Sequence, residues 1–71
     1  MRVTYDPTAD AAFIYLVEIP PGGVARTHLC DVAIQDGAII LDFDHDSRLV
    51  GIEVLGASRV LPPSILARKG T

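Results

Sequence analysis

Two segments in the second half of the chain place large apolar residues at every second position, which is the period of a β-strand. They span residues 39–44 and 49–55, and four residues separate them. Because successive side chains of a strand point to opposite faces of a sheet, one antiparallel register puts the apolar members of both segments on the same face. In this register Asp44 faces Leu49, and the apolar pairs are Phe43–Val50, Leu41–Ile52 and Ile39–Val54. The pattern predicts a β-hairpin.

The rest of the sequence predicts further strands and a short helix. Residues 3–5, 12–18 and 24–30 are rich in β-branched and aromatic residues, and turn-forming residues separate them. The last of these patterns leaves open a continuation through Val32 and Ile34. Residues 61–69 contain two prolines near their start and precede Gly70, which predicts a helix of about two turns. We therefore expect a mainly β (α+β) fold, with a small antiparallel sheet or meander of about five strands and a short C-terminal helix.

The size of the chain limits how it can be stabilised. Its 71 residues suffice for a single domain, in which residues 1–58 form the sheet and residues 59–71 form a tail with the short helix. Small domains commonly rely on disulfides, a metal or self-association. Cys30 is the sole cysteine, so no disulfide can form within one chain.

The apolar content of the chain favours self-association. Hydrophobic residues make up 49% of the sequence, and the mean hydropathy is +0.36. Residues 12–18 are apolar on both faces, and a two-turn helix of about 12 Å cannot cover a sheet of four or five strands. We therefore expect a homodimer. Its shared surface should contain the large apolar side chains Phe13, Tyr15, Ile40 and Leu55.

Charge and hydropathy disfavour two classes of partner. Nine acidic residues against six basic ones give a net charge of -3, opposite to what a phosphate backbone attracts, so nucleic acid is not expected. The longest apolar run, residues 11–17, is too short to cross a bilayer, and no membrane association is expected. The first residues do not form the charged and then apolar pattern of a secretory signal, which favours a cytoplasmic location.

An alternating acidic segment raises calcium binding as an alternative function. Asp42, Asp44, Asp46 and Glu53 stand at positions one, three, five and twelve of a calcium-loop pattern. Position six, which should be glycine, is Ser47, and both flanks have strand rather than helix periodicity. The hairpin explains the same acids as turn formers, since Asp44 and Asp46 fall in its loop. A divalent-cation site at Asp42, Asp44 and Asp46 remains the alternative to a protein-interaction role.

Histidine and cysteine residues offer little chemistry by their spacing. His28 and Cys30 share one face of a predicted strand, and His45 lies in the hairpin loop. Three ligands from two segments are fewer than a structural zinc site uses, and a Cys-His-Asp nucleophile system would need a pocket that so short a sheet has little material to build. Cys30 is better interpreted as a small buried hydrophobe and His28 as a partly exposed strand residue. No cofactor and no enzymatic activity are expected.

The chain resembles a family of small bacterial proteins of unknown function, DUF2283. Its likeness covers nearly all of the chain up to Ser58. It is carried by residues 5–11, 37–44, 49–55 and 57–58, which read YDPTADA, GAIILDFD, LVGIEVL and AS. The family usually has glycine where this chain has Ser47, a residue type suited to a left-handed turn, and an acidic or polar stretch in place of residues 30–35. The resemblance implies a compact, mostly β fold and supplies no catalytic residues.

The resemblance also bears on function. Members of the family are sometimes encoded beside small toxin-like proteins, which implies a partner-binding role. We therefore expect a non-enzymatic module that self-associates and contacts other proteins, with an antitoxin-like pairing to a small protein as one form of that role. Calcium binding is the alternative.

Overall fold

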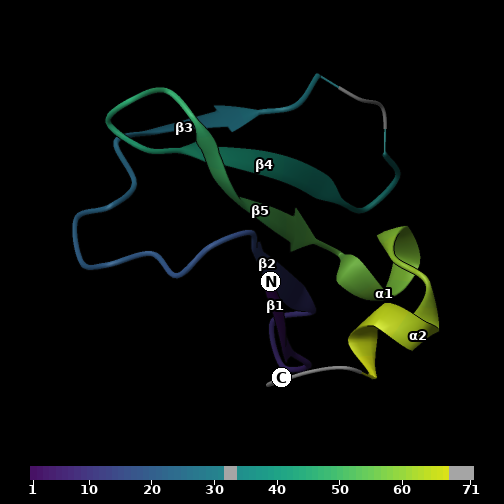
Figure 1. The fold of residues 1–71 in the computed structure, drawn as a ribbon. Coiled ribbons are helices and arrows are strands. Elements are labelled where there is room, and N and C mark those ends of the chain that lie inside the picture. The colour runs from purple at the N-terminus through teal and green to yellow at the C-terminus, as the bar shows by residue number, and fades with distance from the viewer. Residues whose placement is uncertain (32–33, 68–71) are drawn as a thin grey trace.

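The protein folds into one five-stranded antiparallel sheet with two short helices at its C-terminal end (Figure 1). A computed structural model describes residues 1–31 and 34–67. In chain order the elements are β1 (Arg2–Asp6), β2 (Ala11–Tyr15), β3 (Arg26–Leu29), β4 (Ala38–Phe43), β5 (Leu49–Leu55), α1 (Ala57–Val60) and α2 (Pro63–Leu66). The predicted fold class, a mainly β antiparallel sheet with C-terminal helix, is confirmed.

The strands do not follow one another across the sheet in sequence order. Their spatial order is β1-β2-β5-β4-β3, so that β5 lies in the centre between β2 and β4. The chain reaches this arrangement through residues 16–25, which leave β2 and run round to the far edge strand β3 (Figure 1). The central strand β5 therefore pairs with a strand on each edge, and its residues Ile52 and Val54 face the side on which the helices pack.

The predicted hairpin register holds along most of its length and fails near the loop. Leu41 pairs with Ile52 and Ile39 with Val54, as predicted, but a bulge follows Asp42, and Phe43 pairs with Leu49 instead of Val50. Asp44 is correspondingly opposite Arg48, whose carbonyl oxygen accepts its N–H at 2.9 Å, and not opposite Leu49. The loop is one residue shorter than predicted because Ser47 adopts a left-handed conformation (φ 62°) after a tight turn, a known three-residue hairpin geometry.

Three predicted elements differ in their limits. The strand expected over residues 12–18 ends at Tyr15, and the one expected over 24–30 covers Arg26–Leu29; part of its open continuation, at Val32, lies outside the described residues. The helix expected over 61–69 is observed only as the four-residue α2, and a second four-residue helix, α1, precedes it where no helix was predicted. Pro62 separates them, because a residue before proline avoids helical geometry and Leu61 is accordingly extended. The end predicted for this helix, residues 68–69, is outside the described part.

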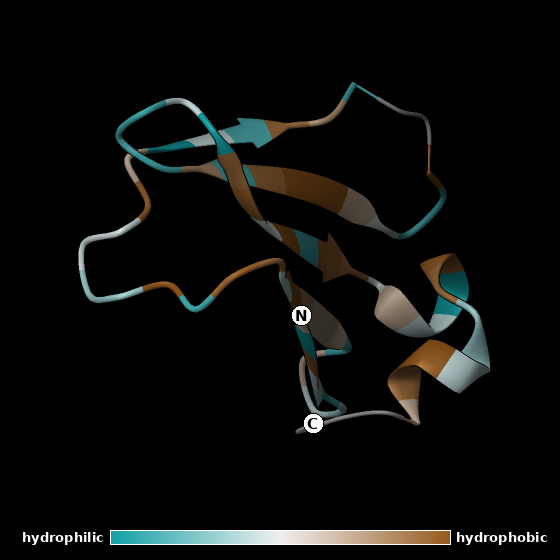
Figure 2. Ribbon diagram, in the orientation of Figure 1, coloured by the Kyte–Doolittle hydropathy of each residue, from teal (hydrophilic) through white to brown (hydrophobic). Residues whose placement is uncertain are grey.

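The two faces of the sheet are covered unequally. On one face Ala12 and Val54 pack against Ala57, and partly buried neighbours complete this core. These neighbours are Tyr5, Ile52, Val60, Leu61 and Leu66. No described helix lies on the opposite face, which we call the bare face and define by Phe13, Tyr15, Ile40, Asp42, Glu53 and Leu55. Figure 2 shows that the central strands are strongly hydrophobic along much of their length.

Gly56 makes the sharp turn from β5 into α1. Its backbone is left-handed (φ 67°), and a Cβ there would collide with the carbonyl oxygen of Asp36 in the loop before β4. Gly22 has a similar conformation (φ 75°), but nothing in the described residues lies within 4 Å of where its Cβ would be. Both glycines therefore have a left-handed backbone, but only at Gly56 would a side chain collide with a neighbouring segment.

This difference predicts unequal losses of stability. Gly22→Ala should lower the free energy of unfolding by about 1 kcal/mol, the strain of a left-handed alanine. Gly56→Ala should lower it by more than about 3 kcal/mol, because backbone must also move. Urea denaturation followed by circular dichroism measures both. Equal losses would mean that the contact with Asp36 is unimportant.

Candidate functional site

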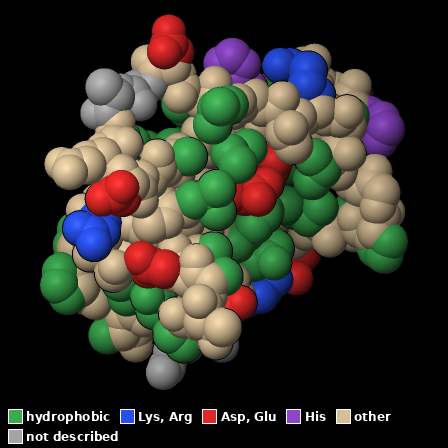
Figure 3. Space-filling view, turned by 180° about the vertical axis from the view of Figure 1, so that it is seen from behind, with side chains coloured by type: hydrophobic (Ala, Val, Ile, Leu, Met, Phe, Trp, Pro, Cys, Tyr) green, Lys and Arg blue, Asp and Glu red, His purple; other side chains and the backbone are tan. Residues whose placement is uncertain are grey.

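The structure brings the four predicted interface residues onto one surface. Phe13 and Ile40 are paired with Glu53 from either side, and Tyr15 and Leu55 lie on the same face of their strands. Phe13, Tyr15 and Ile40 are half-buried, and Leu55 is 43% exposed. Figure 3, which views the molecule from behind, shows hydrophobic side chains gathered around an acidic group in the middle. The bare face is thus an apolar surface with a charged centre.

An aromatic ridge crosses the bare face. The rings of Phe13 and Tyr15 lie 4.3 Å apart between centroids, and the guanidinium of Arg2 lies 3.9 Å from the centroid of the Tyr15 ring. Arg2 also donates a hydrogen bond from Nε to Glu18 at 3.3 Å. The Phe13 ring covers Gly51, since its Cε1 atom is 2.7 Å from where a Cβ of that glycine would be. An aromatic ring laid over a strand glycine fixes the ring in place.

Two carboxyl groups lie beside this ridge. Asp42 is 1% exposed, and neither of its oxygens accepts a hydrogen bond from the residues that the structure describes. Glu53 is a diagonal neighbour on the adjacent strand, because Asp42 pairs with Gly51, two residues before it. Burial raises the pKa of Glu53, and the Asp42 carboxylate raises it further. A proton on Glu53 can be donated to Asp42, which then has the partner that it otherwise lacks.

The hairpin pattern predicts Asp42 and Glu53 on the same face of the hairpin, whereas the calcium-loop pattern relates them only as ligands along the chain. The two residues are eleven positions apart in the sequence. The usable signal was the hairpin register, in which Glu53 falls opposite Ile40 and therefore diagonal to Asp42.

The predicted calcium residues are not gathered around a common point. Asp44 Oδ1 accepts the backbone N–H groups of Asp46 and Arg48, each at 2.9 Å, and so holds the hairpin turn. Asp46 is exposed in the loop, whereas Asp42 is buried within the sheet. Over residues 1–31 and 34–67 no group of three acidic, histidine or cysteine side chains could hold a metal ion. Calcium binding at this loop stays a prediction that the geometry does not favour.

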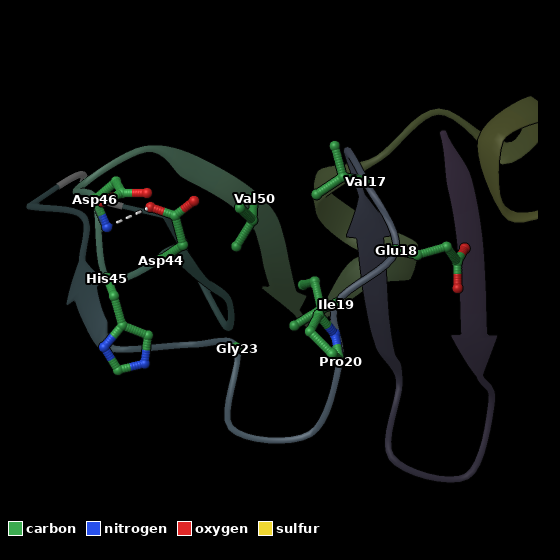
Figure 4. A pocket seen from close by; sticks show the side chains of 9 residues that line it. All are labelled: Val17, Glu18, Ile19, Pro20, Gly23, Asp44, His45, Asp46 and Val50. Carbon is green, nitrogen blue, oxygen red and sulfur yellow. Dashed lines mark hydrogen bonds between the residues drawn. The ribbon is translucent and has the colours of Figure 1, made fainter.

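A pocket of about 280 Å³ lies between this hairpin loop and the loop after β2 (Figure 4). Its apolar lining comes from Val17, Ile19, Pro20 and Val50, and its polar lining from Glu18, Asp44, His45 and Asp46. His45 Nε2 is 3.1 Å from the carbonyl oxygen of Gly22, which ties the two loops together. The pocket can take a small apolar group with a positively charged end, since carboxylates surround an apolar interior.

His28, Cys30 and His45 do not form a catalytic group. His28 is exposed and pairs with Leu41 on β4, and Cys30 is partly buried just after β3. His45 lies at the other end of the β3–β4 pair, beside the pocket. A thiolate nucleophile needs a base within hydrogen-bond reach, which this separation does not provide.

A network around Asp10 joins the first hairpin to α1. Its Oδ1 accepts hydrogen bonds from Tyr5 Oη at 2.7 Å and from the Ser58 N–H at 2.9 Å, and its Oδ2 accepts one from Ser58 Oγ at 2.7 Å. The carbonyl oxygen of Asp10 accepts the N–H of Ala57 at 2.9 Å. The hydrogen bonds from Ser58 and then Tyr5 lower the pKa of Asp10, and the bond to Asp10 raises the pKa of Tyr5. The residues of the YDPTADA and AS motifs thus serve structure.

Comparison with known proteins yields one match. The model of a family described as a protein of unknown function, DUF2283, matches residues 2–58. Neither the curated proteins nor the solved structures contain a match to this chain. The matched range ends at Ser58, the last member of the Asp10 network. Within the described residues, no helix has the length and apolar character needed to cross a membrane.

The turn role of Asp44 predicts a loss of stability that calcium does not affect. Asp44→Ala should lower the free energy of unfolding by about 1–2 kcal/mol, because two backbone N–H groups lose their acceptor. Asp46→Ala should change little. Thermal melts of both variants with and without millimolar calcium measure this. A calcium-dependent rise in the melting temperature of the unmodified protein, lost in both variants, would instead indicate a cation site.

The lowered pKa of Asp10 predicts how stability depends on pH. A carboxylate whose pKa is lower in the folded than in the unfolded chain stabilises the fold above the unfolded value, and this contribution disappears as the pH falls through the folded value. Asp10→Asn should therefore lower the melting temperature at neutral pH by about 5 °C. Its difference from the unmodified protein should shrink below about pH 4. Asp46→Asn, an exposed control, should show no such convergence.

Proposed function

The chain belongs to the DUF2283 family, and we propose that it acts as a non-enzymatic protein-interaction module that self-associates through the bare face. The observation that carries this proposal is a sheet face with Phe13, Tyr15, Ile40 and Leu55 side by side that no described helix covers. Aromatic side chains in an apolar patch are typical of protein interfaces.

The composition of the core supports this proposal. The described hydrophobic residues that are buried are all valine or alanine: Val3, Ala12, Val50, Val54 and Ala57. The larger leucine, isoleucine and phenylalanine side chains are at most partly buried. Obligate homodimer interfaces resemble a domain core cut in half, and a chain whose buried hydrophobic residues are all small fits one half of such a core.

The total surface gives the same indication. The protein exposes 4737 Å², whereas a folded monomer of 7.6 kDa is expected to expose about 4,300 Å². An excess of about a tenth fits a subunit whose face is meant to be covered. A standard interface removes about 800 Å² from each partner, which is more than this excess.

A second copy is the occupant that the apolar residues fit. In a two-fold arrangement each copy offers the other the same patch of Phe13, Tyr15, Ile40 and Leu55, while Arg2 stays at the β1 edge with Glu18. A small protein partner, in an antitoxin-like pairing, would use the same face. The acidic chain disfavours nucleic acid as a partner, and a free Cys30 thiol suits the reducing cytoplasm.

Replacing Leu55 tests the face. Leu55→Lys should weaken association at least tenfold, since it places a charge where about 1.5 kcal/mol or more of apolar burial is expected. Leu49→Lys is the matched control, because Leu49 lies on the same strand with similar exposure (38%) but pairs with Phe43 at the hairpin end, outside the bare face.

Light scattering at micromolar concentrations measures the result. The unmodified protein and Leu49→Lys should show twice the 7.6 kDa mass of one chain, and Leu55→Lys should show the single mass. Circular dichroism confirms that each variant is folded. A folded, unmodified protein that stays monomeric up to about 100 μM would refute self-association, since its Kd would then be too weak for a stable dimer.

A further inference from the structure

The proposed interface has an acidic centre that no basic residue in the described part of the chain neutralises. Glu53 lies between Phe13 on β2 and Ile40 on β4, two of the residues placed in the shared surface. A partner that covers Phe13 and Ile40 therefore also covers Glu53. Asp42 is already 1% exposed and has no hydrogen-bond donor in the described part of the chain. Association would thus remove Glu53 from water beside a carboxyl group that is already buried.

The charged groups of the surrounding strands do not balance this pair. On the bare face, β1 contributes Arg2 and Asp6, and β2 contributes the hydroxyl of Tyr15. The edge strand β3 contributes Thr27 and Leu29, which carry no charge. Arg2 shares a cross-strand row with Asp42 but is three strands away, about 14 Å at ordinary strand spacing.

Arg2 is also engaged elsewhere. It lies over the Tyr15 ring and donates to Glu18. Glu18 stands outside the sheet, and its side chain is 83% exposed. Among residues 1–31 and 34–67 the pair therefore has no cation within reach, and two carboxylates cannot both remain ionised in an apolar interface without a large desolvation penalty.

We propose that, when two copies associate through the bare face, each Asp42–Glu53 pair takes up one proton from solvent, so that dimerisation is favoured by acid and opposed by alkali. This inference rests on the self-association proposed above. The proton binds the Glu53 carboxylate, and the resulting O–H donates a hydrogen bond to the Asp42 carboxylate. The charge of each pair changes from −2 to −1, and the orphaned Asp42 oxygens gain a donor.

The free chain already favours a proton on Glu53. Burial and the Asp42 carboxylate both raise the pKa of Glu53 before any partner is present. Covering Glu53 removes more water and raises its pKa further. The effect applies at a pH between the pKa of Glu53 in the free chain and its pKa in the dimer. There, an increase of one pH unit raises the Kd of the dimer up to tenfold for each proton that association takes up. Two pairs per dimer give up to a hundredfold per unit.

The experiment measures the Kd of the dimer by sedimentation equilibrium from about pH 5 to pH 8.5, a range that stays above the titration of ordinary carboxylates. The unmodified protein should dissociate as the pH rises. Glu53→Gln, which is neutral and keeps an N–H donor for Asp42, should associate with nearly the same Kd at every pH. Glu18→Gln is the control that removes a carboxylate away from the pair, and it should keep the pH dependence.

Asp42→Asn provides a second variant in case Glu53→Gln folds poorly. Asp42→Asn removes the carboxylate that raises the pKa of Glu53 but leaves Glu53 to be covered, so it should weaken the pH dependence without abolishing it. An unchanged pH dependence in this variant would show that Asp42 takes no part in the proton uptake. Circular dichroism at each pH separates dissociation from unfolding.

The outcomes distinguish the two proposals. A dimer whose Kd is independent of pH would overturn proton uptake while leaving self-association intact. A Kd that falls as the pH rises would do the same, and it would mean that the partner supplies a cation to the pair. Monomers at every pH, for the unmodified protein and for Glu53→Gln alike, would overturn self-association itself. Equal pH dependence in Glu53→Gln and the unmodified protein would assign the titration to another group and refute the inference.

Discussion

The hydrogen bonds of Asp10 determine which side of the sheet the C-terminal helices cover. Its side chain binds Tyr5 and Ser58, and its carbonyl oxygen takes the N–H of Ala57, so α1 starts where the first hairpin turns. Once α1 is held there, Ala57 packs on Ala12 and Val54, and α2 packs on the same side, where it contacts β1 and α1. Two helices of four residues cannot also reach the opposite face. The bare face follows from this junction.

The strand periodicity of the sequence was enough to predict the sheet and most of the hairpin register. It could not predict the bulge after Asp42, because that depends on the left-handed backbone of Ser47, a conformation that alternation does not encode. The central position of β5 was also beyond prediction. Pairing between β2 and β5 joins segments nearly forty residues apart. Apolar residues on both faces of β2 indicate that the strand is covered, but they do not indicate which strand pairs with it.

The apolar residues of the candidate site were easier to place from the sequence than its acids. Phe13, Tyr15, Ile40 and Leu55 were chosen as large apolar residues in excess of what the short helix could cover; the sheet places them on one face, and their role as an interface stays a prediction. The acids were considered in sequence order, as ligands of one ion. In the sheet, Asp44 serves its turn and Asp42 lies beside Glu53, which is near only through strand pairing. Acidic clusters in β proteins are therefore better sought across strands than along them.

A simpler explanation for acids on an apolar face is solubility, since charged residues on a sheet surface prevent unwanted association. This explanation suits a carboxylate that remains in water, and it would suit Glu53 alone. It does not suit Asp42, which is 1% exposed and therefore contributes little to solubility while bearing the free-energy penalty of burial. A buried acid retained without a donor needs one that arrives from outside the fold. A proton carried by Glu53 is the smallest such donor, and covering the bare face is the event that would make it necessary.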